Sequence, residues 1–259
     1  MGAPHWASSV LDSCLRRIPF LAAVQAVAPA HIPRGIQVHL LELALQQGSL
    51  PALLSLLPGP EQERCLRYRR PADQIRFATT RVVLRRLLAQ RLRVAAQDIE
   101  FAMGAFGKPG LPHGVPLFFN VSHAGGFALI ALSAQGPVGV DIEAMARMPD
   151  TSPVHLGFTP DEQRYCDRTA DAHAFLRVWS GKEAVLKALG LGIGQHLPSV
   201  SVIPGPAGHY AVSPHGAGFP LPPQAWQLPA PPGFVAALAL LQPVAAVLGQ
   251  EPEVAAESG

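Results

Sequence analysis

The segment from Pro137 to Lys187 constrains the fold more than any other part of the chain. It opens with an apolar run, 138–143, in which acidic residues alternate with hydrophobic ones, as in a strand with one buried face. It closes with the run 179–187, where a glutamate and a lysine stand four positions apart, as on one face of a helix. The segment therefore predicts a strand and a helix that each present charged side chains from one face.

The acidic residues of this segment predict a metal site. Asp141 and Glu143 share one face of the strand, and Glu183 and Lys187 share one face of the helix. Three carboxylates and an ammonium that converge suit a hard divalent cation and the phosphates it carries. Each pair alone also fits an ordinary surface, because an (i, i+4) Glu–Lys pair stabilises a helix by ~0.3–0.5 kcal/mol. Trp179, one turn before Glu183, favours a partly buried helix face, since exposed tryptophan is uncommon.

Length and composition indicate an ordered globular protein. The chain has 259 residues, of which 49% are hydrophobic and 15% charged, so it can bury a sizeable core as one or two domains. No apolar run approaches the ~20 residues that span a bilayer. The three cysteines, Cys14, Cys65 and Cys166, lack metal-type spacing and predict free thiols in a reducing cytosol. We therefore expect a cytoplasmic protein without a membrane span.

Positive charge is concentrated between Glu61 and Arg93, where ten arginines face three acidic residues. Such a cluster attracts phosphates or an acidic partner, or forms a solvated helix face. Only Tyr68 and Phe77 interleave with it, which is too few for a nucleic-acid stacking surface, so we expect no nucleic acid as a partner. Lysine occurs at only three positions in the chain, two of them next to or one turn from Glu183, which favours a compact ammonium there.

Hydrophobic periodicity predicts both kinds of secondary structure. Helices are expected after residue 51 and over 60–68, 73–92 and 172–189, and a further helix starts at Thr159, where Glu162 completes a capping box. Strands are expected over 35–43, 115–121, 127–133, 138–143, 199–203, 209–213, 225–229 and 233–242. The helix 73–92 is expected to be amphipathic, with Ile75, Ala78, Val82 and Leu88 inward and Arg76, Arg81, Arg85 and Arg86 on other faces.

The order of these elements suggests two related halves. Each half shows a strand, a long helix and hairpin strands in similar order, and the halves meet near residue 138. We expect a weakly ordered lead-in over 1–34, an N-terminal subdomain over 35–137, a C-terminal subdomain over 138–243 and a tail over 244–259.

Two loops add candidate binding residues. Asn120–His123 closes an apolar strand beside a glycine turn, where side chains reach ligands. Its serine and histidine have no acid partner nearby and no Gly-x-Ser-x-Gly elbow, which disfavours a hydrolase triad. Hydrogen-bond donation to a phosphate is the favoured role, and a purely structural role of the histidine is the alternative. The loop Gly104–Pro109 allows close backbone approach to a flat or charged ligand, but it lacks the ending of a Walker motif.

The motifs follow one another in a characteristic order: Gly107–Pro109, Asn120–His123, Gly139–Glu143, Phe158–Glu162 and Trp179–Lys187. In this order the chain resembles the 4′-phosphopantetheinyl transferases of the large, surfactin-synthetase-activating (Sfp) type, over roughly residues 61–202. The resemblance implies an α+β fold of two pseudo-symmetric subdomains. Each would be a small antiparallel sheet packed on a long helix, with coenzyme A in the cleft between them.

The resemblance also implies an activity. This is the Mg²⁺-dependent transfer of phosphopantetheine from coenzyme A to a serine of an apo acyl or peptidyl carrier protein. The products would be the holo carrier and adenosine 3′,5′-bisphosphate, and the enzyme would be a monomer. The acceptor could belong to fatty-acid, polyketide or nonribosomal peptide biosynthesis. Two alternatives stay open: a metal-dependent phosphohydrolase, and a non-catalytic module that binds carrier proteins.

Residue roles carried over by motif complete the expectation. Asp141, Glu143 and Glu183 would hold magnesium, and Glu183 and Lys187 would be catalytic. The residues expected to bind coenzyme A are Arg64, Gly107, Lys108, Asn120, Ser122, His123 and Lys187.

Overall fold

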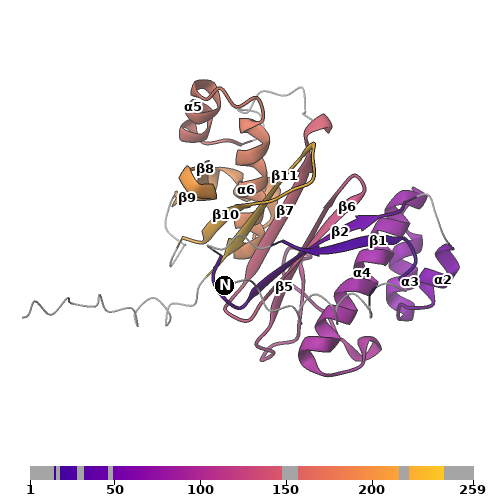
Figure 1. The fold of residues 1–259 in the computed structure, drawn as a ribbon. Helices are drawn as coiled ribbons and strands as arrows, with labels where there is room; N and C mark the ends of the chain where they lie inside the picture. Colours follow the sequence, from indigo (N-terminus) through magenta and orange to yellow (C-terminus); the bar gives the residue numbers. More distant parts are fainter. Residues whose placement is uncertain are drawn as a thin grey trace, which may run out of the picture.

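The computed structural model describes residues 15, 18–27, 32–45, 49–147, 157–215 and 222–241. The predicted tail and most of the predicted lead-in lie outside these residues. The described part of the chain contains two larger antiparallel sheets, a two-stranded hairpin and six α-helices. Figure 1 shows how the two larger sheets and the helices are arranged. This mixture confirms the predicted α+β class.

The first sheet has the strand order β1-β2-β6-β5. Its strands are β1 (Leu21–Ala26), β2 (Ile36–Leu43), β5 (Phe118–Ala124) and β6 (Phe127–Ser133). The second sheet has the order β7-β11-β10-β9-β8. Its strands are β7 (Val138–Ala144), β8 (Val200–Pro204), β9 (His209–Pro214), β10 (Gln224–Leu228) and β11 (Phe234–Leu240). A small hairpin pairs β3 (Ala102–Met103) with β4 (Pro109–Gly110).

The helices are α2 (Leu50–Leu54), α3 (Gly59–Leu66), α4 (Pro71–Leu92), α5 (Pro160–Arg168), α6 (Ala174–Leu189) and α7 (Ile193–His196). Short 3₁₀ turns cover Ala96–Asp98, Met145–Arg147, Leu197–Ser199 and Pro206–Gly208. The capping box is formed as predicted, since the Thr159 hydroxyl accepts the Glu162 N–H and the Glu162 carboxylate accepts the Thr159 N–H. Helix α6 ends at Gly190, which has the positive φ of 72° that glycine adopts without strain.

Alternation along the strands arranges these elements in four layers. One face of β2 and β6 packs on α4, and their other face packs on the second sheet, where Val138, Val140 and Ile142 of β7 lie. The opposite face of the second sheet packs on α6. Figure 1 shows α4 and α6 on opposite sides of the paired sheets. Every strand of the first sheet precedes Pro137 and every strand of the second follows it, while the division into pseudo-symmetric subdomains stays a prediction.

Two features of the fold differ from the sequence analysis. No element was predicted over 21–26, yet β1 pairs there with β2 as the edge strand of the first sheet. The strand predicted over 115–121 begins only at Phe118 and runs to Ala124, because the preceding residues form a proline-rich loop. No helix among the described residues is long and apolar enough to cross a membrane.

The amphipathic interpretation of α4 is wrong for two of its arginines. Arg81 and Arg85 are buried together with Ile75, Ala78 and the other apolar residues of the helix. Arg85 donates to both carboxylate oxygens of Glu61 on α3, at 2.7 and 3.0 Å, and to two backbone carbonyls. These partners neutralise the guanidinium and replace the water that burial removes, so a helix face that looks polar in sequence is part of the core.

Buried His39 on β2 predicts acid sensitivity. Burial, and then the charge of Arg91, lower its pKa from 6.5 to about 4, and its buried Nε2 atom has no hydrogen-bond partner within the residues that the structure describes. The unfolded chain therefore binds this proton more readily, and the stabilisation present above pH 6.5 is lost as the pH falls towards 4. The full shift corresponds to ~3 kcal/mol. We expect His39→Leu to flatten the dependence of unfolding free energy on pH between 6.5 and 4, measured by urea denaturation.

The exposed His113 provides the control for that experiment. His113→Leu is expected to leave the pH dependence as in the wild type. An unchanged pH profile in His39→Leu would show that other groups cause the loss of stability in acid.

Candidate metal and phosphate site

The predicted acidic residues come together where α6 lies across the edge strand β7. One carboxylate oxygen from each of Asp141, Glu143 and Glu183 lies within 4.8 Å of the others. We call these three residues the acid cluster. Gly139 allows this approach, because a Cβ atom there would lie 2.0 Å from the carbonyl oxygen of Ala184 and 2.5 Å from the Ala188 nitrogen. The backbone of α6 therefore rests directly on β7, which brings the helix carboxylate to the strand carboxylates.

Lys187 is the cation of the cluster. Its ammonium donates to Asp141 Oδ1 at 2.6 Å and lies 3.1 Å from Glu183 Oε2. The same ammonium contacts Ser122 Oγ at 3.3 Å, and that hydroxyl donates to Asp141 Oδ1 at 2.8 Å. Burial opposes the charged form of Lys187, but Asp141 and Glu183 outweigh it and raise its pKa. One ammonium thus faces three carboxylates, which leaves an excess of negative charge.

The excess of negative charge affects the pKa of Glu183 and the hydrogen bonding of Asp141. Burial, followed by the charge of Asp141, raises the pKa of Glu183 from 4.5 to about 7, although Lys187 acts in the opposite direction. Asp141 is 2% exposed, and its buried Oδ2 atom has no hydrogen-bond partner among the described residues. A buried carboxylate oxygen without a donor, in a cluster with surplus negative charge, fits a hard divalent cation.

Glu143 accepts a hydrogen bond from a side chain of α6. The indole N–H of Trp179 donates to Glu143 Oε1 at 3.2 Å. Trp179 is partly buried, as the sequence analysis predicted for this face of the helix.

The strand β5 supplies the neighbouring polar residues. Asn120 is buried, and its side-chain oxygen accepts the Val140 N–H at 2.9 Å, which joins the edges of the two sheets beside the cluster. His123 is exposed at the end of β5, near Arg76 and Lys187. Desolvation is the largest cause of the lowered pKa of His123; the backbone opposes this shift, and the two nearby cations add to it.

Arg76 was expected on a polar face of the helix 73–92, but it was not predicted as a residue of the site. Its guanidinium donates through Nε and Nη2 to the Gly125 carbonyl, at 3.1 and 3.0 Å, and so lies over the β5–β6 turn. The spacing of the arginines in 73–92 indicated that this helix carries cations. It does not show which arginine reaches a turn 49 positions away. The same guanidinium forms an ion pair with Asp73, one helix turn earlier on α4, so Arg76 places a partly compensated positive charge near the end of β5.

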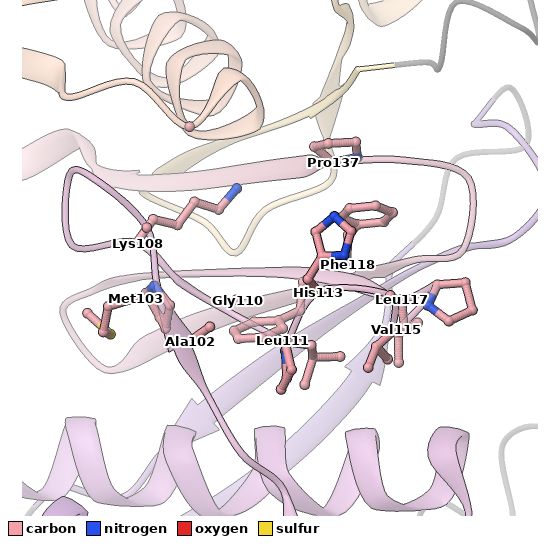
Figure 2. A pocket seen from close by; sticks show the side chains of 17 residues that line it. Ala102, Met103, Lys108, Gly110, Leu111, His113, Val115, Leu117, Phe118 and Pro137 are labelled. Carbon is pink, nitrogen blue, oxygen red and sulfur yellow. The ribbon is translucent and has the colours of Figure 1, made fainter.

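Lys108 lies beside a cavity of about 650 Å³ between the β3–β4 hairpin and the loop that leads into β5 (Figure 2). Its ammonium donates to the Val138 and Lys187 carbonyls, at 3.0 and 2.5 Å, and so ties the hairpin to β7 and the end of α6. Burial, and then the charge of Lys187, lower its pKa to about 8. Gly107, with a φ of 75°, forms the turn just before it.

Arg64 lies on α3 with its guanidinium 5.4 Å from the centroid of the Phe77 ring, and Arg81 approaches the same ring at 5.6 Å. The structure therefore brings Asp141, Glu143, Glu183, Lys187 and Ser122 into direct contact or close proximity. It places Asn120 and His123 at the margin of this group, and Lys108 against the backbone carbonyl of Lys187. Arg64 contacts the aromatic ring of α4 instead of the acid cluster.

Fold and site together define an α+β protein with a lysine-paired acid cluster, suited to a divalent cation and phosphates, where two antiparallel sheets meet. Comparison with known proteins identifies the class. Residues 137–239 match the model of the 4′-phosphopantetheinyl transferase superfamily, and residues 46–135 match that of the 4′-phosphopantetheinyl transferase N-terminal region. The chain belongs to the 4′-phosphopantetheinyl transferase superfamily, a family of enzymes, which confirms the resemblance seen in its motifs.

Individual relatives agree with this assignment. A putative 4′-phosphopantetheinyl transferase of Synechocystis is 37% identical over 158 residues, which cover 58% of this chain and 64% of that protein. The transferase HetI of Nostoc is 31% identical over 61% of this chain and 71% of its own length. The transferase Sfp of Bacillus subtilis is 28% identical, also over 61% and 71%. The matched part is thus less than two thirds of the Synechocystis protein.

Proposed function

We propose that this protein transfers the 4′-phosphopantetheine group of coenzyme A to a serine hydroxyl of an apo acyl or peptidyl carrier protein. The observation that carries the proposal is the contact of Lys187 with Asp141 and Glu183, next to the unpartnered oxygen Asp141 Oδ2, in a member of this family. Such a group of charges suits a pyrophosphate bound together with a divalent cation, and coenzyme A contains a pyrophosphate.

In the reaction, the serine oxygen forms a bond to the β-phosphorus of coenzyme A. The bond between that phosphorus and the bridging oxygen breaks, and adenosine 3′,5′-bisphosphate leaves. Glu183 accepts the serine proton, since its carboxylate lies in the cluster and points from the helix towards β7. The ammonium of Lys187 stabilises the negative charge that develops on the leaving pyrophosphate oxygen.

The three residues of the acid cluster would hold Mg²⁺, which supplies charge neutralisation of the pyrophosphate when it is bound. Asp141 contributes an oxygen that receives no hydrogen bond from the described part of the chain, and Glu143 is already oriented by an indole N–H. Ser122 positions Asp141 and Lys187 through its hydroxyl.

Phosphate recognition is assigned to the end of β5. His123 lies near the cations Arg76 and Lys187, and its imidazole is proposed to donate a hydrogen bond to the 3′-phosphate of coenzyme A. Arg64 is proposed to contact the same phosphate, and this assignment depends on the family resemblance. The Gly107–Lys108 turn and Asn120 are proposed to line the nucleotide, with the Lys108 ammonium holding the loop in place through two backbone carbonyls.

The direct test is to incubate the protein with coenzyme A, Mg²⁺ and an apo carrier protein, and to measure the mass of the carrier. A gain of one phosphopantetheine group, with stoichiometric release of adenosine 3′,5′-bisphosphate, is the expected result. Release of phosphate or nucleotide without a change in carrier mass would indicate a phosphohydrolase. Carrier binding without either product would indicate a non-catalytic module.

Replacing His123 by alanine is expected to weaken binding of coenzyme A about 10-fold or more, because a hydrogen bond to a charged phosphate contributes about 1.5–3 kcal/mol. Binding of 3′-dephospho-coenzyme A should change little. Calorimetric titration of both nucleotides into the wild type and the variant measures the difference. His209→Ala, an exposed histidine on β9, is the control. Equal losses for both nucleotides would show that His123 does not contact the 3′-phosphate.

A further inference from the structure

Trp179 packs beside two near-parallel aromatic rings, those of Phe158 and Phe175. The ring centroid of Trp179 lies 6.3 Å from that of Phe175 and 6.5 Å from that of Phe158, with interplanar angles of 12° and 23°. Phe158 and Phe175 are themselves stacked at 5.0 Å, and both are buried. The near-parallel rings restrict the rotation of the indole, so the direction of its N–H group is fixed by packing.

The fixed N–H group points at a residue of the acid cluster. It donates to Glu143 Oε1 at 3.2 Å, and so connects α6 to a carboxylate on β7. Trp179 lies one helix turn before Glu183. Helix α6 therefore contributes one carboxylate of the cluster directly and orients a second one through the indole.

The hydrogen bond has a chemical consequence for Glu143. A carboxylate with one oxygen bound to a donor offers its other oxygen more readily, so it favours binding a metal through a single oxygen. Mg²⁺ requires a near-ideal octahedral arrangement with short bonds, whereas Ca²⁺ accepts bidentate carboxylates and flexible geometry. A donor that restrains the carboxylate thus favours the smaller ion.

We propose that Trp179 is a positioning residue that restrains Glu143 as a one-oxygen ligand and makes the acid cluster selective for Mg²⁺ over Ca²⁺. The inference rests on the proposed function, because it assumes that the acid cluster holds the metal. It goes beyond that function by assigning metal preference to a residue outside the cluster.

The chain contains a matched control for this indole. Trp226 on β10 is 2% exposed, and in the described ranges its buried Nε1 atom meets no hydrogen-bond partner. Trp226→Phe therefore removes a buried indole that orients no carboxylate. Trp179→Phe removes the donor but keeps an aromatic ring that can stack on Phe158 and Phe175.

The experiment measures metal binding, not turnover. Mn²⁺ is titrated into the full chain with saturating coenzyme A, free Mn²⁺ is followed by electron paramagnetic resonance, and Mg²⁺ and Ca²⁺ are added as competitors. Trp179→Phe is expected to reduce the affinity for Mg²⁺ about 10-fold, because it removes a hydrogen-bond partner of a metal ligand. The affinity for Ca²⁺ is expected to fall by less than about 3-fold. Trp226→Phe should leave both affinities unchanged. Melting temperatures of all variants confirm that folded protein is compared.

A double-mutant cycle tests whether the effect passes through Glu143. In a Glu143→Gln background, Trp179→Phe is expected to have no further effect on Mg²⁺ affinity, since the restrained carboxylate has already been removed. Additive losses would overturn the proposal, as would equal Mg²⁺ affinity in the wild type and Trp179→Phe, or equal weakening by Trp226→Phe. Absence of metal binding in the wild type would overturn the proposed metal site together with this inference.

Discussion

Replacing Glu183 by glutamine is expected to slow phosphopantetheinyl transfer by at least about 10³-fold, because one substitution removes both a proton acceptor and a metal-binding carboxylate. Glutamine has nearly the same shape, so the packing of α6 on β7 should persist. The rate is measured from the mass of an apo carrier protein at saturating coenzyme A and Mg²⁺. Glu42→Gln, which removes an exposed carboxylate from β2, is the control and should retain wild-type rates.

The same substitution should not destabilise the protein. In the metal-free protein the pKa of Glu183 is raised from 4.5 to about 7, so its ionisation opposes folding as the pH rises through that interval. Removal of this carboxylate should leave the melting temperature at pH 8 in metal-free buffer unchanged or higher. A variant that transfers within a few-fold of the wild-type rate would contradict both roles of Glu183. If Glu183→Gln melts far below the wild type, Glu183→Asp tests the catalytic role instead. This substitution keeps the negative charge but shortens the side chain, so its transfer rate should also be low.

The acid cluster could be predicted because its members obey local periodicities. Asp141 and Glu143 stand two apart on a strand, and Glu183 and Lys187 stand four apart on a helix, so each pair defines a face without any tertiary information. Which surface each face meets depends on the sheet order, in which β7 is an edge strand beside β11. Gly139 made the close approach of α6 possible, but a glycine in a strand does not itself say which element comes near.

Burial of charged side chains could not be predicted, because it depends on partners far along the chain. Arg85 is neutralised by Glu61, 24 positions away, and by carbonyls beyond the end of its own helix. The scarcity of lysine was a better guide. Lys187 meets Asp141, Lys108 meets two backbone carbonyls, and Lys182 meets Glu162. Each lysine has a specific partner, yet the sequence indicated neither the partner of Lys108 nor that of Lys182.

The pair of Lys182 and Glu162 leads to the largest expected effect on stability. Both side chains have 0% exposure, and the ammonium donates to Glu162 Oε2. The same carboxylate accepts the N–H groups of Thr159 and Val202, each at 2.8 Å, so it joins the start of α5 to β8. Burial lowers the pKa of Lys182, while Glu162 opposes that shift. The ammonium therefore compensates a carboxylate that is held in the core by two backbone donors.

Lys182→Met is expected to reduce the free energy of unfolding by about 3–5 kcal/mol, because it leaves the Glu162 carboxylate buried without its cation. Urea denaturation followed by circular dichroism measures the loss. Arg164→Met is the control. Arg164 and Asp161 form an ion pair on α5, the helix of Glu162, with side chains 57% and 48% exposed. Loss of this exposed pair should reduce the free energy of unfolding by less than ~1 kcal/mol. The double variant Lys182→Met, Glu162→Gln should recover part of the stability, because the unpaired charge is gone. If Lys182→Met cost no more than Arg164→Met, the buried pair would not contribute to the stability of α6. The position of its neighbour Glu183 would then depend on the packing of α6 against the second sheet and on the close approach of α6 to Gly139.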